Sequence, residues 1–309
     1  IADHQVDGMV LLPGAAFIDT AFAVAEQVLE GDGALCVENV EVSRPLVLEG
    51  DATLLYRTSY HPQRRLVEMA SREESGGPWT RHAQAHVSRV VFDDSLRAPV
   101  FGAGEDLDVA SAYARFAQMG LVYGPACQRM TSLSICGDTV RAELSALENA
   151  PTDVTHHLHP TVLDGAFQSL LAVVLTGGDT PWVPTGIDEI TVRAPVTGPV
   201  VCIGRVKSRS EREIVGELWL SDAAGQLLVH VDGVHCVPAK RAHDPLQGLL
   251  NTENYESMMP VGEPMRLGAW MVLSEDGCAP GSVGEAVSRS LVQANAARVL
   301  AFAVGTDPG

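Results

Sequence analysis

The first segment with side chains suited to chemistry lies at the start of the chain. It places His4 ahead of Gly8 and of the pair Pro13-Gly14, which opens an apolar helical stretch. A histidine is a suitable base because its reference pKa lies near neutrality. Gly8 permits a tight backbone turn, and backbone N–H groups at a helix start can polarise a carbonyl oxygen. Taken alone, His4 is as well explained as a terminal residue without a role.

A second segment, far along the chain, offers a carboxylic acid. Here His159-Pro160 opens another apolar helical stretch, and Asp164 and Gln168 follow at helical spacing on one face. If its apolar neighbours desolvate Asp164, the pKa of that carboxyl rises and it is a protonated acid at neutral pH. The alternative is an ordinary carboxylate whose negative charge is stabilised by the helix dipole at the N-terminal end of the helix. A base from one segment and an acid from the other predict proton-transfer chemistry at the seam of a pseudo-duplicated fold.

A third candidate is Tyr123, which precedes the turn Gly124-Pro125 and offers a phenol hydroxyl as a hydrogen-bond donor. A tyrosine packed at the end of a strand is the alternative. The run His156-His157-Leu158-His159 suggests metal binding, but no cysteine or clustered carboxylate completes a site. We interpret these histidines as a polar approach to the second helix and predict no metal site.

The composition limits the class of protein. The chain has 309 residues, 46% of them hydrophobic and 19% charged, which suits a globular protein with a substantial core. A net charge of −18 argues against nucleic-acid binding, which needs a basic surface. No apolar run reaches the roughly 18 residues of a membrane span. The six cysteines form no CxxC pair and indicate reduced thiols in a cytoplasmic protein. The chain opens with Ile1, without Met or a signal peptide, so we expect a segment of a longer protein.

The elements that must position these residues occur in the same order twice. Helical spacing over residues 13–30 and again over 160–176 is followed in each case by strand-like runs. These runs are 36–42, 53–60, 66–71 and 82–92 in the first half, 132–145 before the second helix, and 189–193, 200–208, 214–221 and 227–237 after it. A long helix followed by antiparallel strands, twice, predicts an α+β fold with a sheet wrapped around a helix in each half.

The region after residue 240 has a different pattern. Residues 241–262 are polar and irregular, and the runs 269–273, 283–295 and 299–304 are typical of strand, helix and strand at the opening of a βαβ domain. No glycine-rich fingerprint follows the first of these runs, so we assign this partial α/β tail no cofactor. The predicted division of the chain is 1–92, a linker at 93–111, 112–240 and a tail at 241–309.

Taken together, the motifs of this chain resemble those of the dehydratase domains of modular type I polyketide synthases. Four motifs of that family are matched in order and spacing over about residues 1–240: HxxxGxxxxP, the W-x-x-H-A strand, YGP and HPxxxDxxxQ. The matching residues are His4, Gly8 and Pro13; Trp79 to Val87; Tyr123-Gly124-Pro125; and His159-Pro160 with Asp164 and Gln168. Each motif is weak alone, whereas the combination is specific.

The resemblance implies a double hotdog fold, in which two antiparallel sheets each wrap around a long central helix. It implies that His4 removes the α-proton of a 3-hydroxyacyl thioester while Asp164 protonates the departing β-hydroxyl, which leaves a 2-enoyl thioester, usually trans. Tyr123 and Gln168 would support the acid, and the Gly14 N–H would bind the thioester carbonyl. The other residues implied at the substrate site are Gly8, Pro13 and Pro125.

The resemblance also implies partners. The substrate would hang on the phosphopantetheine arm of an acyl carrier protein, no cofactor would be bound, and the domain would act beside other domains of the same synthase as a homodimer. The tail resembles the linker and first part of a structural ketoreductase subdomain. A double-bond isomerase or oxa-cyclase on the same scaffold is an alternative, as is a catalytically silent dimer scaffold. The joint presence of His4 and Asp164 argues against the silent scaffold.

Two stretches differ from the family pattern. Where the family often has Leu-Pro-Phe-Ser-Trp, this chain has Trp182-Val183-Pro184-Thr185, which changes the expected shape of the substrate tunnel. Cys127 stands where the family often has a Phe after the YGP motif, so we expect a roomier pocket there.

Overall fold

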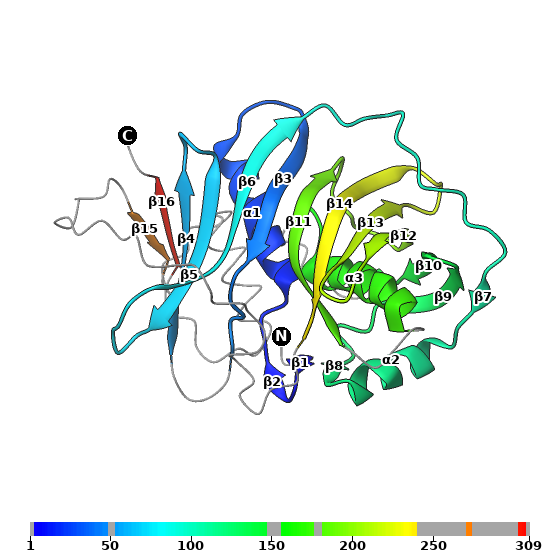
Figure 1. The fold of residues 1–309 in the computed structure, drawn as a ribbon. Helices are drawn as coiled ribbons and strands as arrows, with labels where there is room; N and C mark the ends of the chain where they lie inside the picture. Colours follow the sequence, from blue (N-terminus) through cyan, green and yellow to red (C-terminus); the bar gives the residue numbers. More distant parts are fainter. Residues whose placement is uncertain are drawn as a thin grey trace.

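The computed structural model describes residues 3–48, 53–146, 156–175, 181–239, 270–273 and 302–306. In each half of the chain a long helix lies in the hollow of a curved antiparallel sheet (Figure 1). This arrangement confirms the predicted α+β class and the double hotdog plan. One continuous apolar core contains residues from both central helices and from both sheets.

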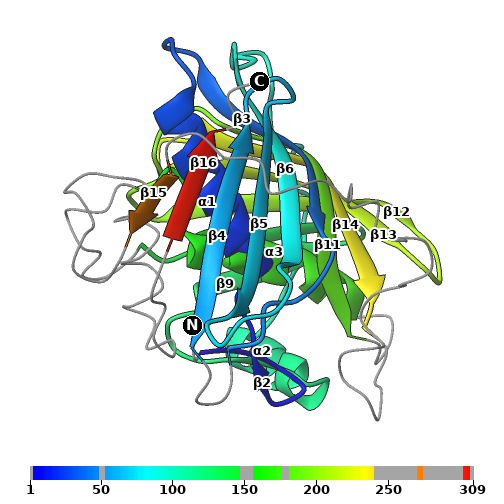
Figure 2. The ribbon, with the colours of Figure 1, turned by 90° about the vertical axis from the view of Figure 1, so that its left-hand side faces the viewer.

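The first half is built around α1 (Gly14–Val28). Phe17, Ala21 and Val24 are fully buried along one stripe of this helix, as its helical spacing predicted. Figure 2 shows the sheet from its outer side, with α1 behind it. The strands are β3 (Ala34–Val42), β4 (Leu54–His61), β5 (Leu66–Glu73) and β6 (Thr80–Val90), in the spatial order β4-β5-β6-β3.

The second half is built around α3 (Pro160–Leu175). Leu170 of this helix lies so close to the sheet that a Cβ atom at Gly216 would come within 2.3 Å of its Cδ2 atom. Glycine at this position therefore lets the helix approach the strands. The strands are β9 (Met130–Cys136), β10 (Thr139–Leu144), β11 (Trp182–Val192), β12 (Val200–Arg209), β13 (Ile214–Ser221) and β14 (Leu227–Pro238), in the order β11-β14-β13-β12-β10-β9.

The two predicted sheets are joined into one. Strand β3 at the edge of the first half pairs antiparallel with β11 at the edge of the second, with Val37 opposite Ile190 and Glu38 opposite Glu189. Edge strands present unpaired N–H and C=O groups, and this pairing satisfies both edges. The α1 and α3 helices also contact each other across the seam.

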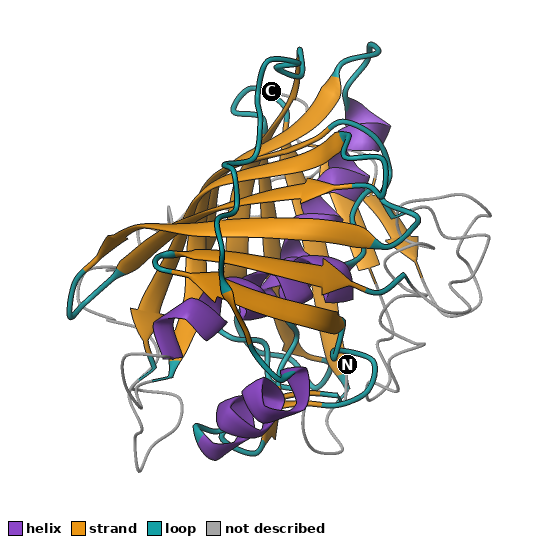
Figure 3. Cartoon of the chain, turned by 90° about the vertical axis from the view of Figure 1, so that its right-hand side faces the viewer, coloured by secondary structure: helices purple, strands orange, loops and turns teal. Residues whose placement is uncertain are grey.

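The predicted linker at 93–111 is more structured than expected. Figure 3 shows it crossing the outer face of the second sheet, where Phe92, Leu96 and Phe101 pack on a small cluster that includes the buried Trp219. Strand β7 (Glu105–Asp106) then pairs with β9, and α2 (Val109–Gln118) begins inside the predicted linker. The connection is therefore packed against the second half along much of its length.

A small second sheet crosses between the halves. It consists of β1 (His4–Val6), β2 (Met9–Val10) and β8 (Leu121–Tyr123), in the order β2-β1-β8. The first strand of the chain thus pairs with a strand of the second half, which the division at residue 92 did not anticipate.

Only two strands of the tail are described, β15 (Trp270–Leu273) and β16 (Phe302–Thr306). They pair with each other antiparallel, whereas the strands of a βαβ unit would be parallel, and β16 adds to the edge strand β4 in parallel. The antiparallel direction of these two strands contradicts the βαβ interpretation, and it is β16, not β15, that pairs with the edge strand β4. The helix predicted at 283–295 lies outside the described residues. Among the described residues, no helix has the length and apolar character needed to cross a membrane.

Candidate active site

His4 is positioned by a tight hairpin and by pairing with the second half. Asp7 and Gly8 both have positive φ angles, 48° and 82°, which is the backbone of a two-residue turn between β1 and β2. The predicted turn at Gly8 is therefore confirmed. On the other side His4 lies opposite Tyr123 of β8, with ring centroids 5.7 Å apart. The Nδ1 atom of His4 is 3.2 Å from the carbonyl oxygen of Leu11. An N–H donated there leaves Nε2 with its lone pair free.

Asp164 lies on α3 and faces this histidine. Its Oδ1 atom is 3.9 Å from Nε2 of His4, and the residue is only 7% exposed. Burial raises the pKa of the Asp164 carboxyl above its usual value, although the nearby His4 and the hydrogen bond from Gln168 both act to lower it. The Asp164 carboxyl is therefore desolvated, and it lies beside a histidine from the start of the chain.

Gln168 holds the second oxygen of this acid. Its Nε2 atom donates to Oδ2 of Asp164 at 2.6 Å and to the carbonyl oxygen of Cys127 at 3.2 Å. The hydroxyl of Tyr113 donates to Oε1 of Gln168 at 3.1 Å, and the Met130 N–H donates to that hydroxyl at 3.2 Å. Burial raises the pKa of Tyr113 to about 12, so the hydroxyl keeps its proton. The face shared by Asp164 and Gln168 is as predicted.

Tyr113 is a site residue that sequence reasoning missed. It lies on α2, most of which was assigned to no element. Two signals mark this helix: the Asp108 side chain accepts the Ser111 N–H as an N-terminal cap, and Tyr113 and Phe116 share one buried stripe.

Tyr123 contributes to the site in a different way from the one expected. In the described part of the chain, no hydrogen bond joins its hydroxyl to Asp164, whose carboxyl is held by Gln168 instead. Its ring packs edge-on against His4 and Phe116. Burial raises the pKa of Tyr123 well above its usual value, and the negative charge of the Asp164 carboxylate adds to this effect. Tyr123 is therefore a neutral wall of the site, placed there by β8.

The turn after Tyr123 fastens the start of the chain. The Gly124 N–H donates to the Asp3 carbonyl oxygen and the Ala126 N–H to its carboxylate, both at 2.7 Å. A Cβ atom at Gly124 would come within 2.5 Å of Asp3, so glycine is required for this approach. The predicted substrate residues Gly8, Pro13 and Pro125 do not line the cavity that the described residues form. They shape the backbone that carries His4 and Gly14, because a turn or a helix start needs their restricted or permissive φ angles.

Asp164, His4 and Tyr123 open onto one cavity, together with Gly14 at the first turn of α1. The N–H groups of a first helical turn have no partner within the helix. A Cβ atom at Gly14 would meet only Val42, at 3.9 Å. The other lining residues are almost all apolar: Val6, Leu11, Leu12, Phe17, Val42, Pro45, Leu121, Phe167, Leu171, Trp182, Val183, Pro184 and Thr185.

His82, the histidine of the W-x-x-H-A strand, supports one wall of this cavity. Its ring is buried, lies 2.7 Å from the Ser71 hydroxyl and stacks over Phe17. The backbone N–H groups of Ser43 and Arg44 donate to its carbonyl oxygen. These contacts fix the segment that leads from β3 into the cavity wall.

The other histidines ahead of α3 have structural contacts. His156 is 2.8 Å from the Asp19 carboxylate of α1. His159 accepts the Thr161 N–H at 3.2 Å and so caps the first turn of α3. Burial, with the charges of His156 and Arg129, lowers the pKa of His159 to about 3, so its ring is neutral and can accept this bond. These contacts agree with a polar approach to the helix.

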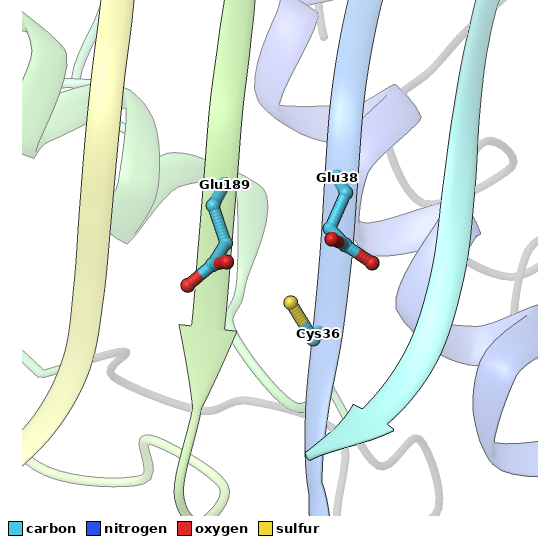
Figure 4. Close-up of side chains that lie close together, drawn as sticks. All are labelled: Cys36, Glu38 and Glu189. Carbon is cyan, nitrogen blue, oxygen red and sulfur yellow. The ribbon is translucent and has the colours of Figure 1, made fainter. Parts of the chain in front are cut away.

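One group of potential metal ligands lies elsewhere, at the junction of β3 and β11 (Figure 4). The ligand atoms of Cys36, Glu38 and Glu189 lie within 4.8 Å of one another. The Ser88 hydroxyl already donates to Glu38, and the Thr191 hydroxyl to Glu189. Burial raises the pKa of the Cys36 thiol to about 11, which keeps it in the protonated form that binds metals poorly. None of the three lines the cavity at His4.

Comparison with known proteins points to one family. Residues 1–72 match the family described as polyketide synthase dehydratase domain, and residues 93–246 match the one described as polyketide synthase dehydratase N-terminal domain. A phenolphthiocerol/phthiocerol polyketide synthase of Mycobacterium tuberculosis is 28% identical over 301 residues, which cover 89% of this chain and 16% of that protein. Polyketide synthase GfsA of Streptomyces halstedii is 34% identical over 185 residues, which cover 55% of this chain and 2% of that protein. The chain thus spans less than a fifth of these relatives.

Solved structures resemble the fold. The dehydratase domain of RzxB from Pseudomonas fluorescens superposes with a TM-score of 0.67 at 23% identity, over 77% of this chain and 90% of that one. GphF dehydratase 1 superposes with a TM-score of 0.66 at 25% identity, over 77% of this chain and 88% of that one. The fold is that of a double-hotdog protein in which a histidine and an aspartate, His4 and Asp164, line one cavity. By its motifs and these matches, the chain belongs to the dehydratase domains of modular type I polyketide synthases.

Proposed function

We propose that this domain removes water from a 3-hydroxyacyl thioester to give a 2-enoyl thioester, usually trans. The observation that carries the proposal is the distance of 3.9 Å between Nε2 of His4 and Oδ1 of Asp164 in the lining of an apolar cavity. A substrate whose α-carbon lies near the histidine and whose β-hydroxyl lies near the acid would have both groups within reach. Because both groups act from the same side of the cavity, a syn elimination is favoured.

His4 is proposed as the base. Its Nδ1 contact with the Leu11 carbonyl fixes the ring and leaves Nε2 to take the α-proton. An α-proton beside a thioester is only weakly acidic, so the negative charge that develops on the carbonyl oxygen needs a hydrogen-bond donor. The Gly14 N–H at the start of α1 is proposed for that role, because Gly14 lines the same cavity and the N–H groups of a first helical turn have no partner within the helix.

Asp164 is proposed as the acid. Hydroxide is a poor leaving group, so the β-hydroxyl must receive a proton as its bond to carbon breaks. The raised pKa of the buried Asp164 favours the neutral form that can give this proton. This step leaves Asp164 as a carboxylate and His4 as an imidazolium, and it releases water and the enoyl thioester. Transfer of the proton from His4 back to Asp164 then resets both groups. Two of the structural neighbours are variants of the CurK dehydratase that are described as inactive. One replaces an aspartate by asparagine, and the other replaces a histidine by phenylalanine.

The substrate is proposed to arrive on the phosphopantetheine arm of an acyl carrier protein, with the acyl chain in the apolar cavity. This domain has a net charge of −18, so electrostatic attraction to an acidic carrier would be weak. Covalent attachment within one synthase raises the effective concentration of the carrier and offsets this. Elimination by an acid and a base uses no bound cofactor. A homodimer beside other synthase domains in the cytoplasm completes the proposal.

The test uses (3R)- and (3S)-3-hydroxyacyl thioesters on a carrier protein, followed by mass spectrometry. Loss of one water from one enantiomer, absent in His4→Ala and in Asp164→Asn, is the expected result. His235→Ala, at a surface histidine paired with Asp188 and Glu213, is the control and should keep full turnover. A shifted double bond or a cyclic ether from an enoyl substrate would indicate the isomerase or oxa-cyclase instead. Wild-type turnover in both His4→Ala and Asp164→Asn would refute the assignment of base and acid.

A further inference from the structure

Gln168 and Tyr113 form a chain of hydrogen bonds behind Asp164 that begins at one backbone group and ends at another. Because a carbonyl can only accept and an N–H can only donate, these two backbone groups fix the direction of the bonds between them. The carbonyl oxygen of Cys127 can only accept, so the NH₂ group of Gln168 must face it. The N–H of Met130 can only donate, so it occupies the hydroxyl oxygen of Tyr113 as an acceptor. The single hydroxyl proton of Tyr113 is then left to point at Oε1 of Gln168.

This direction decides which oxygen of the acid carries the proton. The Gln168 amide presents its N–H, and not its oxygen, to Oδ2 of Asp164 at 2.6 Å. An oxygen that accepts such a short hydrogen bond is a poor place for a proton of its own. In the neutral carboxyl the proton therefore sits on Oδ1, which is the oxygen that faces His4 at 3.9 Å.

We propose that Tyr113 is a positioning residue that places the transferable proton of Asp164 on the oxygen facing the substrate. It acts through Gln168 and touches neither substrate nor reacting atoms, and the inference rests on the dehydration proposed above. If the Gln168 amide were turned over, its oxygen would face Oδ2 and accept the carboxyl proton on the side away from His4. The Tyr113 hydroxyl opposes this by donating to Oε1, because an inverted amide would lose that hydrogen bond and present an N–H group instead.

Tyr113 shares this task with the Cys127 carbonyl, which also requires the N–H side of the Gln168 amide. The ionisable groups that act on Asp164 besides Tyr113 are His4, Tyr123 and Cys127. Burial raises the pKa of Cys127 to about 12, so its thiol is neutral. Tyr113 itself is nearly buried and is wedged by its ring against Phe116 and Tyr123. Its hydroxyl is therefore held at a fixed place relative to the Gln168 amide.

The test is Tyr113→Phe, with Tyr60→Phe as a matched control that also removes a hydroxyl from a buried tyrosine. In Tyr113→Phe only the Cys127 carbonyl still opposes inversion of the Gln168 amide, so the inverted form becomes more populated. We expect kcat to fall about tenfold, because the acid remains but its proton is often on the wrong oxygen, and KM to stay unchanged. The basic limb of the kcat–pH profile should move to higher pH, since an inverted amide accepts from the neutral carboxyl and stabilises it. An unmoved limb with a fall in kcat no larger than in Tyr60→Phe would overturn the proposal.

Two further variants separate positioning from packing. Incorporation of p-aminophenylalanine at position 113 keeps an N–H donor to Gln168 and should retain the wild-type profile even if Tyr113→Phe does not fold. Loss of kcat in that variant, with a folded domain, contradicts the proposal. In a Gln168→Ala background, Tyr113→Phe should cause no further change, because its partner is gone. Absence of turnover in the wild-type domain would overturn the proposed function as well, whereas an active wild type with an additive double variant refutes only the role of Tyr113.

Discussion

The close approach of α3 to its sheet predicts a large effect of a single methyl group at Gly216. A Cβ atom there would lie 2.3, 3.1 and 3.2 Å from the Cδ2, Cδ1 and Cγ atoms of Leu170. Leu170 is only 1% exposed, and protein interiors are close-packed, so its side chain can move only by displacing its neighbours. Overpacking of this kind costs about 1–3 kcal/mol. At about 2–4 °C per kcal/mol for a domain of this size, the melting temperature of Gly216→Ala should fall by roughly 2–12 °C.

The matched control is Gly198→Ala, because no atom lies within 4 Å of a Cβ there. Thermal and urea unfolding of the two variants measure the difference. Leu170→Ala alone should cost about 2–5 kcal/mol through the cavity that it leaves. The double variant should cost less than the sum of the two, since the new methyl group fills part of that cavity. Since α3 also carries Asp164, Gly216→Ala should lower kcat as well. Equal melting temperatures for Gly216→Ala and Gly198→Ala would refute the reasoning.

Two more predictions concern ionisable groups. Burial alone would lower the pKa of His156, but its hydrogen bond to Asp19 and the charge of that carboxylate raise it on balance. The pair therefore stabilises the fold at pH values below the usual histidine pKa, and this contribution is lost as the pH rises through the raised value. Unfolding measured from pH 5 to 8 should show this loss in the wild type and not in Asp19→Asn. For Asp164 the expected change of fold stability with pH has the opposite sign to that of an ion-paired carboxylate. Its pKa is raised in the fold, so its penalty appears as the pH rises above the ordinary aspartate value. Asp164→Asn should be inactive yet more stable than the wild type at pH 8, and no more stable at pH 3; a destabilised Asp164→Asn at pH 8 would contradict the buried-acid interpretation.

The central helices were predictable because each carries its signals in consecutive residues. Pro13 precedes the buried stripe of α1, and Gly31 follows it with a φ of 104°. The long strand β11 was predicted only from Glu189 onward, although it begins at Trp182. Pro184 and Gly186 are typical of a loop, and the strand accommodates them through a shift of register between them.

The joined sheet and the support of the acid could not be predicted from local pattern. The pairing of β3 with β11 joins residues such as Val37 and Ile190, and nothing in either strand specifies the other. Tyr113 likewise gains its role only from a hydrogen bond to Gln168, a contact between distant parts of the chain. Motif spacing identified the groups that could act, whereas the contacts that orient them depend on tertiary packing.

The way His4 is held bears on how the site responds to movement between the two halves. The histidine belongs to the first strand of the chain, but that strand pairs with β8 of the second half, where Tyr123 lies opposite it. Asp164 is carried by α3 of the same half, and the Gly124 turn fastens Asp3 there as well. The distance between His4 and Asp164 is therefore set mainly by contacts that hold the start of the chain to the second half. A shift at the β3–β11 junction would move Gly14 and the cavity wall relative to this pair. Such a shift would change the contact proposed between Gly14 and the substrate carbonyl more than it would change the separation of His4 and Asp164.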